Sequence, residues 1–465
     1  MSFHDLNGPR RDAPAVVDES GNVLSYAQLD ERVDVAADSL RRIGERSLGF
    51  LFCTNRVAHL VAYLAALRAE HVPLLLPVDM PTALRDELRR TYRPAWVVGA
   101  HKGGEQRGGQ DGQVQPDSGI DIEVTGHAAC VLHADLGLLL STSGTTGSAR
   151  LVRLSRRAVQ ANAESIAQYL ALGEGERAVT TLPPSYSYGL SVVNSHLQAG
   201  GCLVLTEQGV LSREFWATVQ RHAVTSLAGV PATHQMLLRT GFERMALPSL
   251  RTFTQAGGAL GERDAKALCG LAAARGWRFF VMYGQTEATA RISYVPPQRL
   301  ADKIGSIGVA IPRGELSVDA ANGELIYRGP NVMMGYASGP DDLARGDELH
   351  GVLRTGDLGR CDADGFFHVT GRLKRFIKLA GLRVGLDEVE RGLHGATGLP
   401  VSAGGCDDKL VVWLECDGGA QQELASAWMR EMYGLHRSLF RVHCVPQLPL
   451  LANGKRDYRP LLEAA

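Results

Sequence analysis

A run of hydroxyl and glycine residues, Ser141 to Ser148, follows an apolar segment at 136–140. Glycines let backbone N–H groups converge on an anion, and hydroxyls add hydrogen-bond donors without adding charge. The run therefore indicates a phosphate-binding loop, with a Ser/Thr-rich surface turn as the alternative. It is not a Walker P-loop, because no Gly-Lys-Ser/Thr sequence follows it.

Four further segments that could bind a nucleotide follow in order along the chain. They are Tyr283-Gly284-Gln285-Thr286-Glu287, Arg354-Thr355-Gly356-Asp357, Gly371-Arg372 and Asn453-Gly454-Lys455. The first follows a predicted strand at 278–282, a place where α/β folds display ligand-binding groups. Together the five segments resemble the acyl-adenylate-forming superfamily, which includes acyl-CoA ligases, luciferases and peptide-synthetase adenylation domains. The resemblance extends over essentially the whole chain.

The resemblance implies an ATP- and Mg²⁺-dependent enzyme that converts a carboxylic acid to its acyl-adenylate and releases pyrophosphate. It assigns catalysis to Lys455, Glu287 and Thr145, with Glu287 also the ligand of Mg²⁺, a cation that prefers carboxylate and phosphate oxygens. Lys455 would stabilise charge as the carboxylate attacks the α-phosphorus. Tyr283 would stack on adenine, and Asp357 would accept both ribose hydroxyls. The implied nucleotide-binding set is Ser143, Gly144, Thr145, Thr146, Gly147, Ala256, Gly257, Gly258, Tyr283, Gly284, Thr286, Asp357 and Arg372.

The segment at 183–190 resembles the part of the family that lines the acid pocket. Relatives that activate α-amino acids carry Asp near the position of Ser187, and those that activate ortho-hydroxylated aryl acids often carry Asn. Ser187 suits neither, so the resemblance implies an uncharged aliphatic or aryl acid. The implied pocket set is Ser187, Tyr188, Gly189, Gly257 and Gly284, and plain core packing is the alternative role for Tyr188.

The acceptor of the acyl group stays open at this point. The Asn-Gly-Lys-x-Asp ending is similar to that of enzymes that load acyl or peptidyl carrier proteins, whereas the free-standing length is similar to that of CoA ligases. The acceptor is therefore CoA or a carrier-protein phosphopantetheine, with an amine as an alternative. A catalytically silent nucleotide-binding member is disfavoured, because Glu287, Asp357 and Lys455 are all present. Ala149-Arg150 replaces the usual Pro-Lys, which changes the hydrogen-bond geometry at the phosphates.

The elements that must position these residues alternate between helix and strand patterns as far as residue 283, which predicts an α/β fold. Ser25 and Gln28 form a capping-box signature that starts a helix over 24–44. From residue 305 the strands become short and turn-rich. The resemblance implies a large layered N-terminal domain (1–373) and a small mobile α+β C-terminal domain (374–465). Lys374 would be the hinge, and the small domain would carry Lys455 across a shared cleft.

Composition limits the partners. The 465 residues include 49 Lys plus Arg and 50 Asp plus Glu, so the formal net charge of -1 gives no electrostatic reason to expect nucleic acid as a partner. No apolar run reaches the roughly 18 residues of a membrane span. The polar start leaves a cytoplasmic location as the expectation. Eight cysteines without a close pair in the sequence predict neither a zinc site nor a disulfide framework.

Overall fold

The computed structural model describes residues 2–6, 10–99, 113–114, 120–141, 150–373, 375–379, 382–406, 409–433, 435–451, 456–458 and 460. The chain forms two compact units, the first made of Met1–Glu315 with Arg328–Leu353 and the second of Leu316–Tyr327 with Arg354–Ala465. The strands at 316–327 and 354–372 thus group with the C-terminal part, although the sequence placed them in the N-terminal domain. The hinge at Lys374 lies outside the described residues and stays a prediction.

The first unit contains a nine-stranded sheet in the order β16-β15-β14-β13-β12-β10-β11-β1-β2. The strands from β14 to β1 in this order run parallel, whereas β2 at one end of the sheet and β15 and β16 at the other pair antiparallel. Its strands are β1 (Pro14–Val17), β2 (Val23–Ser25), β10 (Arg177–Val179), β11 (Cys202–Val204), β12 (Ser226–Gly229), β13 (Thr252–Gln255), β14 (Arg278–Tyr283), β15 (Ser293–Val295) and β16 (Val309–Ala310). Candidate site residues follow β13 and β14, where parallel strands end at one edge.

The first unit also contains an eight-stranded sheet in the order β19-β9-β8-β4-β3-β5-β7-β6. Its strands are β3 (Leu48–Cys53), β4 (Val72–Pro77), β5 (Trp96–Val98), β6 (Gln113–Val114), β7 (Ile122–Val124), β8 (Leu136–Ser141), β9 (Leu151–Ser155) and β19 (Gly335–Ala337). Strand β3 is buried at every position, as expected for a strand covered on both faces. The hydroxyl-rich loop leaves this sheet at the end of β8.

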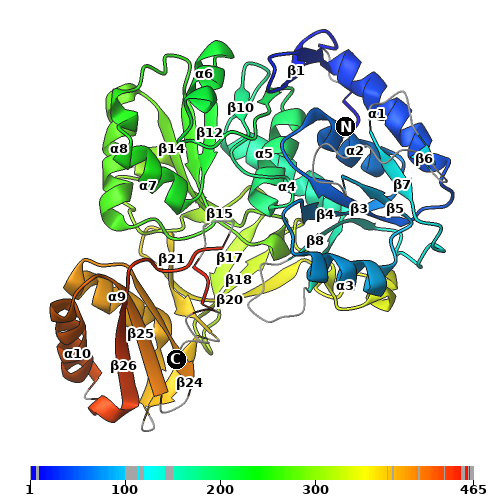
Figure 1. Ribbon diagram of the computed structural model, residues 1–465. Helices are drawn as coiled ribbons and strands as arrows, with labels where there is room; N and C mark the ends of the chain where they lie inside the picture. Colours follow the sequence, from blue (N-terminus) through cyan, green and yellow to red (C-terminus); the bar gives the residue numbers. More distant parts are fainter. Residues whose placement is uncertain are drawn as a thin grey trace. The chain divides into compact units, whose positions relative to one another are not determined.

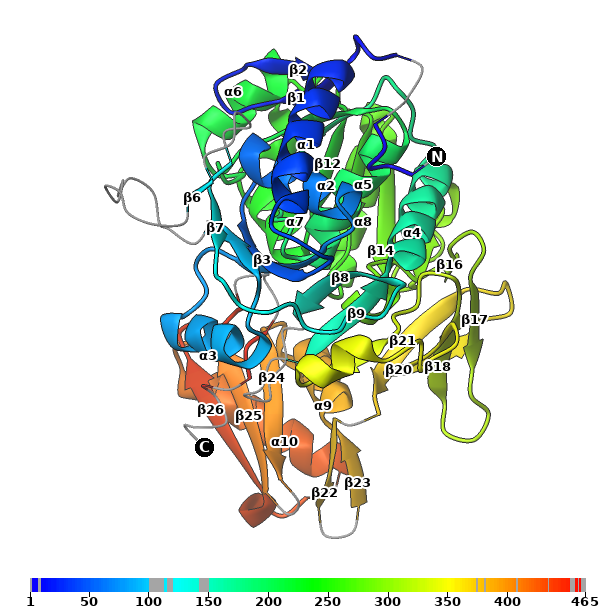
Figure 2. The same ribbon diagram turned by 90° about the vertical axis from the view of Figure 1, so that its right-hand side faces the viewer.

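Helices separate the two sheets and cover them. Helix α4 (Arg156–Tyr169) contacts β8 and β9, while its neighbour α5 (Ser187–Gln198) contacts β10 and β11, so this pair connects one sheet to the other. Figure 1 shows α7 (Pro231–Arg239) and α8 (Glu262–Arg275) beside β12 and β14 of the first sheet, and Figure 2 shows α1 (Tyr26–Arg41) and α2 (Val57–Arg68) side by side. The remaining helices of this unit are α3 (Thr82–Tyr92) and α6 (Arg213–Arg221), with short 3₁₀ turns at Phe242–Arg244, Thr286–Ala288, Pro297–Arg299 and Pro340–Ala344.

Helix α1 begins as its sequence predicts. The Ser25 hydroxyl accepts the Gln28 N–H at 3.2 Å, and the Gln28 side chain accepts the Ser25 N–H at 2.9 Å. This capping box satisfies two backbone donors that the first turn leaves free. Helix α1 then buries Leu29, Val33 and Leu40 in the core shared with α2.

The second unit has a four-stranded sheet in the order β17-β18-β20-β21, a hairpin β22-β23 and a three-stranded sheet β24-β25-β26. Their bounds are β17 (Glu315–Val318), β18 (Glu324–Arg328), β20 (Val352–Cys361), β21 (Phe367–Arg372), β22 (Phe376–Leu379), β23 (Leu382–Gly385), β24 (Val401–Cys406), β25 (Lys409–Glu415) and β26 (Phe440–Val445). Helices α9 (Leu386–Thr397) and α10 (Gly419–Tyr433) pack on the last sheet around their own apolar core, and a 3₁₀ turn at Arg437–Leu439 precedes β26. The predicted α/β fold class is confirmed.

No helix within the described ranges is long and apolar enough to cross a membrane.

Candidate active site

The predicted phosphate-binding loop joins β8 to β9. These strands pair antiparallel, with Ser141 opposite Leu151, so both ends of the loop are fixed in the sheet. The loop residues that the sequence assigned to phosphate, Ser143, Gly144, Thr145, Thr146 and Gly147, lie outside the described residues. Their roles stay predictions.

The segment after β14 turns sharply at Gly284. A Cβ at this position would lie 1.9 Å from the Ala290 carbonyl oxygen, so only glycine allows the two backbone stretches to approach so closely. The 3₁₀ turn at Thr286–Ala288 follows and presents Thr286 and Glu287, both half-buried. Tyr283, the predicted adenine-stacking residue, ends the strand and is also half-buried.

Glu287 has a partner that the sequence analysis did not identify. The Tyr336 hydroxyl, from β19, donates to Glu287 Oε1 at 2.8 Å. Burial, followed by the negative charge of Glu287, raises the pKa of Tyr336, so this hydroxyl keeps its proton and remains a donor. The Arg150 guanidinium lies 5.8 Å from the centre of the Tyr336 ring. Within the described residues Glu287 has no ion pair, which leaves its charge available to a cation.

The donor chemistry around Glu287 fits the predicted Mg²⁺ role. Mg²⁺ keeps several waters and is held in proteins by one or two carboxylates together with substrate phosphates. Across the described parts of the chain no three His, Cys, Asp or Glu side chains come together as a metal site. One fixed carboxylate is what a phosphate-bound Mg²⁺ requires from the protein.

The predicted adenine wall at 256–258 directly follows β13. Ala256 is buried, and the Gln255 side chain donates to the Gly258 carbonyl at 2.8 Å, which fixes the turn. Gly257 has φ +86°, and a Cβ there would lie 2.4 Å from the Tyr186 hydroxyl. Tyr186 therefore occupies the space that a side chain at position 257 would fill.

Two segments that the sequence assigned to different ligands meet in this unit. Ser187, from the predicted acid pocket, lies at the start of α5, and its hydroxyl is 3.2 Å from that of Thr286, from the predicted nucleotide segment. Ser187 is buried, with 7% of its surface exposed. Gly189 lies in the same first helical turn. Ninety-nine residues of sequence separate the two hydroxyls.

Tyr188 lies behind this contact and not on an open surface. Its hydroxyl donates to the Thr254 carbonyl at 3.0 Å and contacts the Thr254 hydroxyl at 2.7 Å. Burial raises the pKa of Tyr188 to about 12, although the nearby positive charge of Arg291 opposes the rise. The ring is 2% exposed and belongs to an apolar cluster, so Tyr188 supports the pocket through packing.

Arg291 is the residue in this region that the sequence analysis missed. It lies four positions after Glu287, is 3% exposed, and places its guanidinium carbon 4.0 Å from the centre of the Tyr188 ring. The available signal was a basic residue between Ala290 and Ile292, both of them apolar. That signal does not distinguish a buried arginine from an exposed one.

The second unit brings two predicted nucleotide-binding residues together. Asp357 in β20 lies opposite Arg372 in β21, and Arg372 Nε is 3.0 Å from Asp357 Oδ1. Asp357 is 4% exposed, and its own N–H donates to the Thr355 hydroxyl at 3.1 Å. Neighbouring Arg354 pairs with Asp319 at 2.7 Å and Glu324 at 2.6 Å.

The two lysines predicted to act in catalysis and hinge motion, Lys455 and Lys374, lie outside the described residues. Their flanks are described, and both belong to the second unit. Leu450 and Arg456 form an antiparallel bridge on either side of the segment that carries Lys455. Arg375 forms ion pairs with Asp387 and Glu390.

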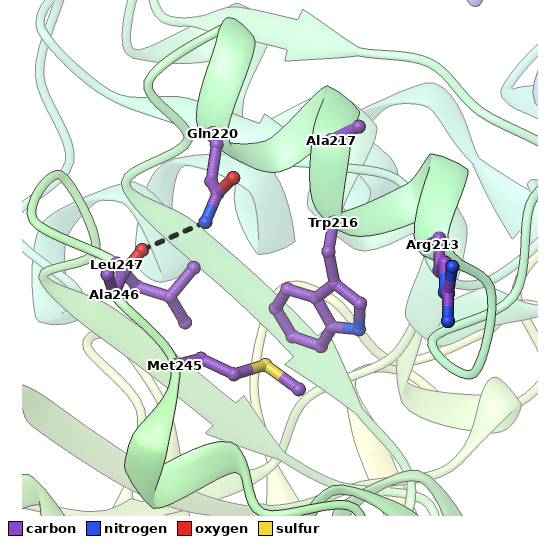
Figure 3. Close-up of a pocket in the computed structure, with 7 residues that line it drawn as sticks. All are labelled: Arg213, Trp216, Ala217, Gln220, Met245, Ala246 and Leu247. Atoms are coloured by element: carbon purple, nitrogen blue, oxygen red, sulfur yellow. Dashed lines mark hydrogen bonds between the residues drawn. The ribbon is translucent and has the colours of Figure 1, made fainter.

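A surface cavity of about 300 Å³ elsewhere in the first unit contains none of these residues. It lies between α6 and the segment at 245–247, and Figure 3 shows the Met245 side chain beside the Trp216 indole. Gln220 closes one end by donating to the Ala246 carbonyl at 3.1 Å. The lining residues are Arg213, Trp216, Ala217, Gln220, Met245, Ala246 and Leu247. Arg213 is the sole charged group among these lining residues, so the cavity lacks the groups that acid–base catalysis requires.

The chain is similar to known proteins over most of its length. The family of AMP-binding enzymes matches residues 4–337. A feruloyl-CoA synthase from Amycolatopsis sp. is 30% identical over 94% of this chain and 93% of its own length, and an oxalate–CoA ligase from Arabidopsis thaliana is 29% identical over 73% and 70%. Among solved structures, the o-succinylbenzoate CoA synthetase of Bacillus subtilis in complex with ATP and magnesium covers 99% of this chain and 98% of its own, at 22% identity and a TM-score of 0.75.

Proposed function

The chain belongs to the AMP-binding enzymes of the acyl-adenylate-forming superfamily, and on that premise we propose that it is an ATP-dependent acid–CoA ligase. The observation that carries the proposal is the contact between Ser187 and Thr286. The first lies in the acid-pocket segment and the second in the nucleotide segment, so an acid and an ATP bound to these segments would meet at this point. Relatives named for CoA thioester formation support CoA as the acceptor.

The reaction has two steps. A carboxylate oxygen of the acid attacks the α-phosphorus of ATP, the bond to the β-phosphate oxygen breaks, and pyrophosphate leaves. The CoA thiolate then attacks the acyl carbonyl, the carbon–oxygen bond to AMP breaks, and the thioester forms. In the first step two anions approach each other, so a cation positioned between them stabilises the transition state. We assign this role to Lys455.

The groups of the first unit would hold the reactants. Glu287, held by Tyr336, would bind Mg²⁺, and the metal when bound would neutralise part of the triphosphate charge. Thr286 and the hydroxyl-rich loop that includes Thr145 would donate to phosphate oxygens. Gly257 and Gly258 would form one wall of the adenine site, with the Tyr186 hydroxyl filling the space beside Gly257.

The groups of the second unit would hold the ribose and move the catalytic lysine. Asp357 would accept the ribose hydroxyls while Arg372 holds its carboxylate in place. Burial alone would lower the pKa of Arg375, but the carboxylates of Glu390 and Asp387 outweigh it and raise that pKa, so this side chain stays charged and fixed to α9. A rigid Arg375 supports a pivot at the residue before it, Lys374.

The identity of the acid is open within the family. Ser187 provides no negative charge for an α-ammonium group, which argues against α-amino acids. The names of the two relatives refer to feruloyl and oxalate, so family membership alone does not define the acid.

The test is pyrophosphate release from MgATP across a panel of aliphatic, aryl and dicarboxylic acids. The products are identified by mass after addition of CoA, a phosphopantetheinylated carrier protein or an amine. We expect acid-dependent pyrophosphate and an acyl-CoA. Release of ADP and phosphate would exclude the adenylate mechanism. A carrier-bound product without acyl-CoA would show that the acceptor is a carrier protein and not CoA. ATP binding without turnover would favour the catalytically silent alternative.

A further inference from the structure

We infer that Arg291 makes the acid pocket selective for an acid that carries a second anionic group, such as a dicarboxylate or a sulfonated carboxylate. The inference rests on the proposed function, since it concerns the acid that the same site activates. It changes the expectation of an uncharged acid that Ser187 alone gave. Ser187 argues against a positive charge on the acid but carries no information about a negative one.

The first observation is a buried cation without a counterion. Arg291 is 3% exposed, and no carboxylate of the described residues forms an ion pair with it. It donates to the Ala290 carbonyl at 3.2 Å and lies over the Tyr188 ring, while its Nε makes no hydrogen bond. Buried charges in proteins are normally paired, because removing an unpaired charge from water is costly.

The same unit contains an internal reference for how a buried arginine is otherwise satisfied. Arg153, in β9, is 0% exposed and forms an ion pair with Glu348. It also donates to the carbonyl groups of Tyr336 and Met334. Arg153 is therefore a structural arginine with its full set of partners. Arg291 interacts with the Tyr169 side chain and the Ala290 carbonyl but has no carboxylate partner among the described residues, so its positive charge is not neutralised by the protein there.

The second observation is position. A Cβ on Gly284 would lie 2.8 Å from the Cα of Arg291, so Arg291 packs directly against a residue of the predicted pocket. Burial raises the pKa of Tyr186, and the positive charge of Arg291 opposes that rise. Tyr186 is the residue whose hydroxyl faces Gly257. The backbone of Arg291 therefore packs against Gly284, while its guanidinium lies over Tyr188 and acts electrostatically on Tyr186, the residue before Ser187.

The chemistry of the guanidinium defines the group that it would bind. Its planar array of N–H donors matches the two oxygens of a carboxylate or sulfonate in a bidentate pair. Cation–π contact with Tyr188 fixes the plane of the guanidinium before the ligand arrives, which lowers the entropy cost of binding. The reacting carboxylate of the acid would remain free to attack ATP, while the second anionic group anchors the other end.

The experiment compares matched acids that differ by one charge. Succinate, glutarate and terephthalate are tested against their monomethyl esters, and 3-sulfopropanoate against butanoate, by acid-dependent pyrophosphate release. For at least one pair we expect kcat/KM to favour the dianion by about 10²-fold, the size measured for buried charge pairs. Arg291→Gln should reduce that preference to within a few fold of unity, because the dianion loses far more activity than its monoanionic partner.

Two further variants test whether the effect is specific to the Arg291 guanidinium. Arg291→Lys keeps the charge but loses the planar fork, so it should retain part of the preference, and it replaces the Gln variant if thermal unfolding shows that variant to be misfolded. Arg263→Gln, at an exposed position on α8, is the control and should leave the preference unchanged. Equal activity on both members of every pair, or an equal loss on both in the Arg291 variants, would overturn the inference. Absence of pyrophosphate release with every acid would instead contradict the proposed function.

Discussion

The two units hold their candidate site residues by different means. In the described part of the second unit the candidate charges have protein counterions: Asp357 pairs with Arg372, and Arg354 pairs with Asp319 and Glu324. In the first unit, Glu287 is held by the Tyr336 hydroxyl, and the described residues include no ion pair of Glu287 or Arg291.

The difference indicates which unit has charged groups that a ligand could pair. A paired charge is already satisfied in the free protein, whereas an unpaired one gains a partner only when a ligand binds. A negative Glu287 suits a cation, and a positive Arg291 suits an anion. Under the proposed function, the first unit would select the metal and the acid, and the second would provide prearranged polar groups for the nucleotide together with Lys455.

The largest expected effect concerns the second unit. Lys455→Ala should slow pyrophosphate release by about 10²–10³, the usual cost of removing one preorganised group that faces transition-state charge. It should spare thioester formation from a preformed acyl-adenylate, because no bond to phosphorus forms or breaks in that step. Lys266→Ala, on the exposed side of α8, is the matched control. Equal losses in both half-reactions would contradict the assignment of Lys455 to the adenylation step alone.

Sequence rules predicted well the features that depend on neighbouring residues. Ser25 and Gln28 form their capping box because three residues of helix suffice to bring them together. The resemblance also identified Ser187 and Thr286 as site residues, and the structure places their hydroxyls in contact. Their proximity could not come from local pattern, since it depends on the tertiary fold that brings the start of α5 to the turn after β14.

Arg291 shows where sequence reasoning stops. Its significance lies in the absence of a counterion, and a counterion is a property of the three-dimensional neighbourhood. Arg153 and Arg291 are both single arginines among apolar residues in the sequence, yet the structure pairs one with Glu348 and leaves the other without a carboxylate. Lys374 and Lys455 stay predictions that rest on the resemblance.

Buried His234 should make the stability of the first unit depend on pH. His234 in α7 is fully buried against the Thr254 carbonyl, and burial lowers its pKa to about 4 from the usual 6.5. Between pH 6.5 and 4, His234 binds a proton in the unfolded chain but stays neutral in the folded unit. The free energy of unfolding of the first unit should therefore fall as the pH falls, by about 2 kcal/mol between pH 7.5 and 5.

Urea unfolding at pH 7.5 and pH 5 measures this contribution. In His234→Gln the glutamine keeps a donor toward Thr254 but cannot titrate, so the variant should lose the roughly 2 kcal/mol that His234 contributes while buried His71 and His196 keep their own contributions. His127→Gln, at an exposed position, is the control. An equal pH dependence of the free energy of unfolding in His234→Gln and His127→Gln would show that protonation of His234 does not cause the loss of stability in acid.

The smallest expected effect tests whether the pocket of the first unit is as closely packed as its geometry indicates. Gly257→Ala forces an alanine into φ +86° and places its Cβ where the Tyr186 hydroxyl lies, 2.4 Å away. Backbone strain and overpacking should together cost about 1–3 kcal/mol. We expect the KM for the acid to rise about tenfold with a smaller change in the KM for ATP, because the displaced Tyr186 is the residue next to Ser187 in the predicted acid pocket.

The double variant Gly257→Ala with Tyr186→Phe separates the two causes. Removing the hydroxyl relieves the steric contact but not the backbone strain, so the KM for the acid should recover part of the way while the loss of thermal stability remains. Tyr186→Phe alone is the matched control, since it removes the hydroxyl from an otherwise native turn. A double variant no better than Gly257→Ala would mean that strain in the 256–258 turn, and not contact with Tyr186, shapes the pocket. An equal rise in the KM for ATP would assign the turn to the nucleotide and leave acid selection to Ser187 and Arg291.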